Sequence, residues 1–83
     1  MDAEQFLVAL GRVIQQRRKR LGLSQEELAN ASGLHRNHVG AIERGRQNVS
    51  VKRLVSICEA LGVPLSMLST LAEAELLDDG NTG

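Results

Sequence analysis

The stretch from Leu23 to Gly45 constrains the fold most, because it contains start and stop signals for two short helices. Ser24 followed three residues later by Glu27 is a capping box, in which each side chain satisfies the backbone N–H of the other residue. Leu23 before the cap and Leu28 at the fourth helical position fit a hydrophobic staple, which fixes the angle at which the chain enters a helix. We therefore expect a helix that begins directly after Ser24.

The same stretch predicts where this helix ends and where the next one lies. The first helix should end near Ser32, because Gly33 can adopt the left-handed conformation that commonly stops a helix. A second helix then turns Val39 and Ile42 inward at a spacing of i, i+3, and Gly45 closes it. Two short helices around a glycine-containing turn predict a helix-turn-helix, whose second helix is built to lie in the major groove of DNA.

Four segments, in this order and at this spacing, are similar to the Cro/C1-type (XRE-type) helix-turn-helix family: Leu23–Ala29, Gly33–Leu34, Ile42–Gly45 and Ala60–Val63. The match extends from residue 10 to residue 69, which is most of the chain. Within this family, the short chain and the segment Glu43–Asn48 resemble the small controller proteins of restriction–modification systems. The resemblance implies an all-α fold, a compact five-helix bundle of the lambda-repressor-like DNA-binding type, with the helix-turn-helix at helices two and three.

Length and composition limit the domain organisation. A chain of 83 residues has room for one domain, which we place at residues 1–77, followed by an acidic tail at residues 78–83 that we expect to be disordered. Phe6 is the single aromatic residue, so the core must be aliphatic, and the single Cys58 excludes a disulfide framework. An unpaired thiol fits a reducing compartment, and neither a membrane-length apolar run nor a secretion signal is visible. We therefore expect a soluble, cytoplasmic protein without a membrane partner.

A net charge of zero argues against DNA binding, but the charges are unevenly distributed. The segment from Leu34 to Arg53 contains one acidic residue, Glu43, and five basic residues: Arg36, Arg44, Arg46, Lys52 and Arg53. From Glu59 onward there is no basic residue, and the acidic residues are Glu59, Glu73, Glu75, Asp78 and Asp79. A local positive surface matters more for DNA binding than the sum of the charges.

Three further helices are expected around the motif. The first should span Glu4 to about Arg20, with an apolar stripe formed by Phe6, Leu10, Val13, Ile14 and Leu21. Ser50 is the expected N-cap of the fourth helix, whose inward-facing residues should be Val51, Leu54, Val55, Cys58 and Leu61. Gly62 should end that helix, and Val63-Pro64 should start the fifth.

The fifth helix has more apolar residues than a four-helix core can bury. Isologous two-fold pairing is the commonest form of oligomer, so we favour a homodimer with the contact residues Leu65, Met67, Leu68, Leu71 and Leu76. Two alternatives stay open at this point. The helix could close only its own core, or it could bind another protein in an antitoxin or adaptor module of the same fold.

Alignment with the family places base reading at the start of the second motif helix. The reading positions fall on Arg36, Asn37, Gly40 and Ala41, with His38 beside them. Arg36 offers a planar fork that matches guanine O6 and N7, and Asn37 matches adenine N6 and N7. Gly40 and Ala41 are small enough to allow close approach, and the Ala41 methyl group can contact thymine. With so few polar readers, DNA shape is expected to contribute to specificity.

Phosphate contacts are expected from polar and basic residues on and after the motif: Gln25, His35, Arg44, Arg46, Asn48 and Lys52. Gln25 opens the first motif helix, where free N–H groups and the helix dipole favour an anion. His35 stands where the family usually has Ser or Thr as a cap. Because an imidazole caps less well, either this helix start is weaker or His35 binds phosphate. The family resemblance also implies that Arg18 pairs with Glu43 as a structural brace.

Catalysis is not indicated by any residue pattern. The chain has no Gly-rich phosphate loop and no nucleophile with an ordered base, so we expect neither enzymatic activity nor a cofactor. His35 and His38 have a spacing that suits a metal, but a third ligand is missing, so we expect no metal site. The sequence predicts a transcriptional regulator that binds double-stranded DNA sequence-specifically, as a homodimer on a palindromic operator. Whether it acts as a repressor or an activator depends on operator position.

Overall fold

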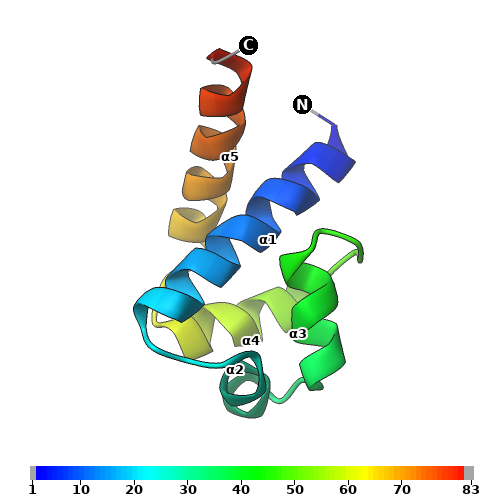
Figure 1. Ribbon diagram of the computed structural model, residues 1–83, viewed down its shortest axis with the longest axis vertical. Coiled ribbons are helices and arrows are strands. Elements are labelled where there is room, and N and C mark those ends of the chain that lie inside the picture. Colours follow the sequence, from blue (N-terminus) through cyan, green and yellow to red (C-terminus); the bar gives the residue numbers. More distant parts are fainter. Residues whose placement is uncertain (1, 82–83) are drawn as a thin grey trace.

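The computed structural model describes residues 2–81, with side chains up to Leu77, and every regular element in this part is an α-helix (Figure 1). In chain order these are α1 (Ala3–Arg20), α2 (Gln25–Ser32), α3 (Arg36–Glu43), α4 (Val51–Leu61) and α5 (Leu65–Asn81). The predicted all-α, five-helix fold is confirmed. Taken singly, none of the described helices is long and apolar enough to cross a membrane. α4 and the part of α5 up to Leu77 would together be long and apolar enough, but the chain bends by 97° between them.

The helices are arranged so that α2 and α3 lie at one end of the molecule and α5 extends toward the other (Figure 1). α1 packs against both α3 and α5, while α2 packs against α3 and α4. α1 and α5 run in opposite directions and diverge toward the two chain termini. The predicted DNA-reading helix and the predicted dimerisation helix therefore occupy different ends of the molecule.

Side-chain caps define the helix boundaries. Ser50 Oγ accepts a hydrogen bond from the Arg53 N–H at 3.2 Å, and Gly62 stops α4 with a φ of 69°, both as predicted. The cap of α1 was not predicted: Asp2 Oδ1 accepts from the Gln5 N–H at 2.8 Å in a second capping box. This cap starts α1 at Ala3.

The core is aliphatic, as the composition requires. Its largest fully buried side chains come from all five helices: Leu10, Ile14, Leu28, Val39, Ile57, Leu61 and Leu68. Burial of each such side chain contributes about 1.5–3 kcal/mol. Phe6 is partly buried and packs against this cluster, and Cys58 is 4% exposed within it.

Three residues predicted to face inward are exposed instead. Leu21 is 45% exposed because it follows the last residue of α1, where the helical stripe no longer continues. In α4, the large apolar side chains that are buried or half-buried are Leu54, Ile57, Cys58 and Leu61, which have the spacing i, i+3, i+4, i+7. Val55, 39% exposed, falls beside this stripe, and Val51, 70% exposed, precedes it at the first residue of the helix.

The packing of α5 corrects part of the predicted dimer surface. Leu68 is 1% exposed and belongs to the protein's own core, so its assignment as a dimer contact is wrong. Leu65 and Leu76 are half-buried against that core, whereas Met67 and Leu71 are each 43% exposed. Only one side of α5 faces the protein core, and sequence spacing alone could not identify which side this is.

The end of α5 also differs from the expectation. The helix continues to Asn81, past the predicted boundary at Leu77. The remaining part of the predicted tail, residues 82 and 83, lies outside the described residues.

Candidate DNA-binding surface

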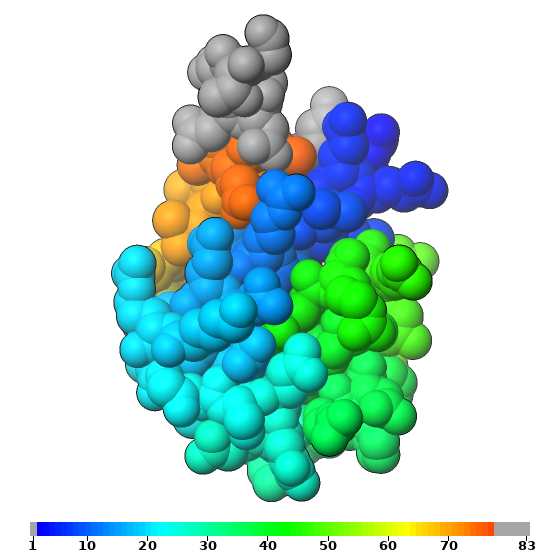
Figure 2. Space-filling model, in the orientation of Figure 1, coloured from blue at the N-terminus to red at the C-terminus, as the bar shows by residue number. Residues whose placement is uncertain are grey.

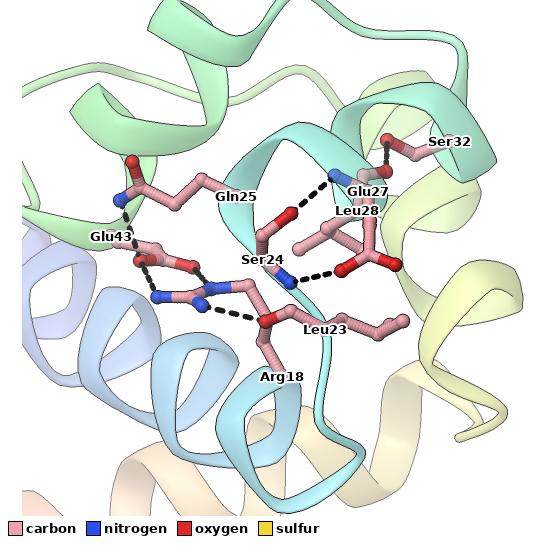
Figure 3. A network of polar contacts seen from close by, with 8 residues as sticks. All are labelled: Arg18, Leu23, Ser24, Gln25, Glu27, Leu28, Ser32 and Glu43. Atoms are coloured by element: carbon pink, nitrogen blue, oxygen red, sulfur yellow. Dashed lines mark hydrogen bonds and ion pairs between the residues drawn. The ribbon is translucent and has the colours of Figure 1, made fainter.

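The capping box predicted at the start of α2 is present, and Figure 3 shows both of its hydrogen bonds. The Glu27 N–H donates to Ser24 Oγ at 3.0 Å, and the Ser24 N–H donates to Glu27 Oε1 at 2.9 Å. Hydrogen bonding with Ser24 lowers the pKa of Glu27, because it favours the charged carboxylate. The Ser24 backbone N–H has the larger effect and the Ser24 side chain the smaller one. Local polar contacts therefore fix the entry into the motif.

The turn between α2 and α3 leads into a histidine cap. Gly33 ends α2 in the left-handed conformation with a φ of 72°, as predicted. His35 is the N-cap of α3, and its Nδ1 accepts a hydrogen bond from the Asn37 N–H at 3.1 Å. A neutral imidazole that accepts at Nδ1 has its proton on Nε2, so the ring keeps one donor available for a phosphate. Capping and phosphate contact, which the sequence analysis set against each other, are thus compatible.

A buried polar network joins α1, α2 and α3 (Figure 3). Arg18 donates from Nε to Glu43 Oε2 at 2.6 Å, from Nη2 to Glu43 Oε1 at 3.0 Å, and from Nη1 to the Leu23 carbonyl at 2.8 Å. Gln25 Nε2 donates to Glu43 Oε1 at 3.0 Å. The Arg18 and Glu43 side chains are only 9% and 1% exposed. The structure thus contains the Arg18–Glu43 pair that the family resemblance implies.

This network holds the end of α3 in a single orientation. The forked contact between guanidinium and carboxylate requires a specific relative geometry of α1 and α3. The hydrogen bond with Glu43 raises the pKa of Arg18, although burial acts in the opposite direction. Gln25 extends the contact to the first residue of α2, a link that the sequence analysis missed because it assigned Gln25 to phosphate alone. The network therefore links all three helices through contacts within the chain.

Two glycines let α1 lie very close to the end of α3. A Cβ built at Gly11 would be 2.6 Å from the Glu43 carbonyl oxygen and closer still to that of Ile42, so a side chain would force the helices apart. At Gly45, whose φ is 69°, a Cβ would be 2.6 Å from Val8 Cα. The sequence analysis identified Gly45 as a helix stop but missed Gly11. An isolated glycine inside a helical pattern was the available signal.

The first turn of α3 presents the base-reading candidates. Arg36 and Asn37 are exposed, whereas His38 and Ala41 are half-buried. Figure 2 shows the surfaces of α2 (cyan) and α3 (green) adjoining at the end of the molecule away from α5. Arg36 and Asn37 therefore lie on the outside of the motif, at the end of α3 that is fixed by the His35 cap.

Gly40 differs from the expectation that it faces the DNA groove, since it is buried. A Cβ built there would be 3.2 Å from Arg44 Nη1, and 3.7 and 3.8 Å from Oε1 and Nε2 of Gln25. The Gln25 and Arg44 side chains thus both lie beside Gly40, where a larger residue would press against them. The missing side chain of Gly40 thus leaves room for these two phosphate candidates.

The other phosphate candidates occupy exposed positions around and after the motif. His35 and Arg44 are exposed at the two ends of α3, and Gln25 is half-buried at the start of α2. Three more candidates follow α3 in the chain and are all exposed: Arg46, Asn48 and Lys52. The predicted phosphate-binding residues thus include a pair that lies beside Gly40, Gln25 and Arg44, and single residues between α3 and the first turn of α4.

His35, the N-cap of α3, and His38 within α3 are not part of a metal-ligand cluster among the described residues. Among the described residues, no group of three or more His, Cys, Asp or Glu side chains could hold a metal ion. His35 Nδ1 is engaged by a backbone N–H, and Cys58 is buried. Burial raises the pKa of the Cys58 thiol, which opposes the thiolate form that binds metals.

Proteins with similar sequences include control proteins and transcriptional regulators. The family model described as Helix-turn-helix matches residues 14–68. The control protein C.SmaI of Serratia marcescens is 44% identical over 48 residues, covering 58% of this chain and 57% of the relative. The control protein C.BamHI of Bacillus amyloliquefaciens is 44% identical over 52 residues, covering 63% and 64%. The chain thus spans less than two thirds of the length of either relative.

A solved structure supports the same assignment. The restriction-modification controller protein C.AhdI from Aeromonas hydrophila matches with a TM-score of 0.73 and 42% identity, over 75% of this chain and 94% of that chain. C.AhdI, like C.SmaI and C.BamHI, is a control protein by name. With residues 14–68 matched by the family model and the same helical fold, the chain belongs to the Cro/C1-type (XRE) helix-turn-helix family of DNA-binding regulators.

Proposed function

We propose that this protein is a transcriptional regulator that binds double-stranded DNA sequence-specifically, as a homodimer on a palindromic operator in the cytoplasm. The observation that supports this most directly is the position of Arg36 and Asn37. Both are exposed on the first turn of a capped helix whose other end is held by a buried ion pair. In helix-turn-helix proteins, the N-terminal residues of the second helix contact base edges in the major groove.

Base readout would rest mainly on two side chains. Arg36 would contact O6 and N7 of a guanine through its planar fork, and Asn37 would contact N6 and N7 of an adenine. Ala41 would contact a thymine methyl group, and the half-buried His38 would lie at the edge of this contact. Since only two of these residues are exposed polar readers, sequence-dependent DNA shape would supply part of the specificity.

Phosphate contacts would fix the register of α3 in the groove. Gln25 and Arg44 both lie beside Gly40 and would bind one phosphate together. His35 would donate from Nε2 while its Nδ1 caps α3. The exposed residues that follow α3 would contact the backbone farther along: Arg46, Asn48 and Lys52. Contacts of this kind position a protein on DNA without reading sequence.

The homodimer would form through α5. Met67 and Leu71 are each 43% exposed on this helix, which lies away from α2 and α3 (Figure 1). Pairing there would leave both recognition helices available for two half-sites. A two-fold protein then requires a two-fold symmetric operator, with half-sites about 10 bp apart or a multiple of that distance.

Selection of bound duplexes from a random pool tests this function. We expect the purified chain alone to enrich a two-fold symmetric sequence. Enrichment of no sequence above the input pool, with a folded protein, would rule out the proposed function. Recovery of a single unpaired half-site would retain DNA recognition but rule out the dimer.

A further inference from the structure

The N-cap of α3 is the one side-chain cap in the described part of the chain that can change charge near neutral pH. Side chains cap four helices: Asp2, Ser24 and Ser50 accept through oxygen, whereas His35 accepts through Nδ1. The Asn37 N–H donates to this nitrogen at 3.1 Å. Histidine is the side chain whose charge ordinarily changes between pH 5 and 8. The cap at the base-reading end of α3 is therefore open to control by protons.

Protonation of His35 removes this cap. A neutral imidazole has one nitrogen that accepts, whereas both nitrogens of the cation donate. The Nδ1–H of the cation would oppose the Asn37 N–H, and its positive charge would lie at the positive end of the α3 dipole. Because His35 is exposed, its ring exchanges protons with the solvent freely. The first turn of α3, which begins at Arg36, then loses the contact that fixes its start.

The neighbouring helix α2 does not pair with a charged His35. α2 packs against α3, and its acidic residues, Glu26 and Glu27, lie in its first turn, at the opposite end from the turn that leads to His35. The Glu27 carboxylate already accepts from the Ser24 N–H. The segment Leu28–Leu34, which connects this end of α2 to His35, contains no charged residue. The charge of a protonated His35 is thus not compensated by α2.

The charged groups of α1 and α3 do not favour a cation at the cap either. Within α3, Arg36 adjoins His35, and His38 adds positive charge when it too is protonated. α1 meets α3 at the far end of that helix, where Arg18 and Glu43 are paired with each other at 2.6 Å. In the free protein, a protonated His35 therefore has positive neighbours on its own turn.

Binding to DNA separates two effects of the proton. An imidazolium donates to a phosphate more strongly than a neutral ring does, and a phosphate contact carries no sequence information. Base reading instead requires that Arg36 and Asn37 be held in one geometry by an ordered first turn. Acidification should therefore raise the affinity for DNA of any sequence while it lowers the preference for the operator.

We propose that His35 makes sequence discrimination by this protein depend on pH. The neutral imidazole caps α3 and holds the base-reading turn, whereas the imidazolium binds phosphate without holding that turn. This regulation rests on the proposed function and acts on the same DNA-binding surface. Its signature is a change of specificity rather than a loss of binding.

Fluorescence anisotropy with the selected operator and with a random duplex, at about pH 8 and about pH 5.5, measures this signature. The dissociation constant for the random duplex divided by that for the operator should fall about fivefold on acidification, the factor that corresponds to one lost N-cap. His35→Ser keeps an acceptor that does not titrate, so its ratio should be the same at both pH values. On the random duplex, acidification should steepen the salt dependence of the wild type more than that of His35→Ser.

His38→Gln is the matched control, because it removes the other imidazole near the start of α3 and leaves the His35 cap in place. Its ratio should fall on acidification as in the wild type. Circular dichroism at both pH values checks that all three proteins keep their helices.

NMR of the isotope-labelled free chain gives a readout that does not involve DNA. The neutral His35 ring should carry its proton on Nε2, because Nδ1 accepts from the Asn37 N–H. At about pH 5.5, the Asn37 amide should be less protected from exchange in the wild type than in His35→Ser, which keeps its cap.

The outcomes separate this regulation from the proposed function. An operator preference that acidification leaves unchanged, or reduces equally in His35→Ser, would overturn the role of His35 and leave the DNA-binding function standing. A neutral His35 ring protonated on Nδ1 would do the same, because such a ring cannot cap α3. A folded chain without sequence preference at either pH would overturn both.

Discussion

Glu43 Oε1 accepts hydrogen bonds from both Arg18 and Gln25, at 3.0 Å each, so one carboxylate links the last residue of α3 to α1 and α2. Since the Glu43 side chain is only 1% exposed, these donors take the place of water. The exposed first turn of α3 therefore depends on a buried contact at its opposite end.

Removing Arg18 should destabilise the domain strongly. Arg18→Met leaves Glu43 as a buried anion with only the Gln25 donor, and breaking such a pair typically costs about 3–5 kcal/mol. The double variant Arg18→Met/Glu43→Leu should lose less than Arg18→Met alone, because no charge then stays buried. Urea unfolding of the three proteins provides the comparison. A double variant that is no more stable than Arg18→Met would show that the cost does not come from leaving Glu43 buried without its partner.

Gly40→Ala should separate stability from DNA binding. The new methyl group meets Arg44 Nη1 at 3.2 Å, which is the far end of a flexible side chain, so the fold can accommodate it. Alanine also favours a helix by about 1 kcal/mol over glycine, and the free energy of unfolding should not fall. DNA affinity should fall, because Arg44 is displaced from its position beside Gln25.

A double-mutant cycle checks the reason for that loss. If Gly40 acts by placing Arg44, the substitution Gly40→Ala should have little further effect on DNA binding in an Arg44→Ala background. Fluorescence anisotropy with one labelled operator gives the four affinities. Independent, additive losses would assign Gly40 a role unrelated to Arg44.

Arg36 and Arg46 should differ in the kind of binding that they support. Arg36→Ala should cost about 1–3 kcal/mol on the cognate operator and relax the preference at one base pair. Arg46→Ala should weaken binding to all sequences alike and reduce the salt slope by about one. Equal losses of Arg36→Ala on cognate and random DNA would remove Arg36 from base reading, and an unchanged slope would remove Arg46 from phosphate binding.

The capping box should make stability depend on pH in the acid range. The pKa of Glu27 is lower in the folded protein than its usual 4.5, mainly through the Ser24 backbone N–H. In the window between the two values the unfolded chain binds more protons, so stability rises with pH there. The contribution is complete above the unfolded pKa and is lost as pH falls through the folded pKa. Urea midpoints of Glu27→Gln across this range should lack that part of the slope, whereas Glu26→Gln should follow the wild type.

Much of the motif could be predicted because its signals are local. Ser24 and Glu27 cap α2, Gly33 stops it and Gly62 stops α4 through interactions within a few residues of each position. The Arg18–Glu43 pair spans 25 residues and was expected only through the family resemblance, since no local rule brings those residues together.

The features that were missed depend on which element lies opposite. Gly11 and Gly40 have roles set by the end of α3 and by the Gln25 side chain, and neither neighbour follows from spacing along a single helix. Leu68 and Met67 are adjacent in sequence, yet Leu68 is buried and Met67 is exposed, because the positions of α1 and α4 determine which side of α5 faces inward.

His35 should be separable into a capping function and a phosphate contact. Its Nδ1 caps α3 through the Asn37 N–H, and loss of a side-chain cap typically costs about 0.5–2 kcal/mol, so His35→Ala should lower both stability and DNA affinity. His35→Ser keeps an acceptor at the cap, so stability should return to that of the wild type or exceed it. If the imidazole Nε2 also donates to a phosphate, the Ser variant should still bind DNA more weakly, at every sequence alike. Full recovery of affinity in His35→Ser would limit His35 to capping, and the two effects can be read from urea unfolding and anisotropy on the same samples.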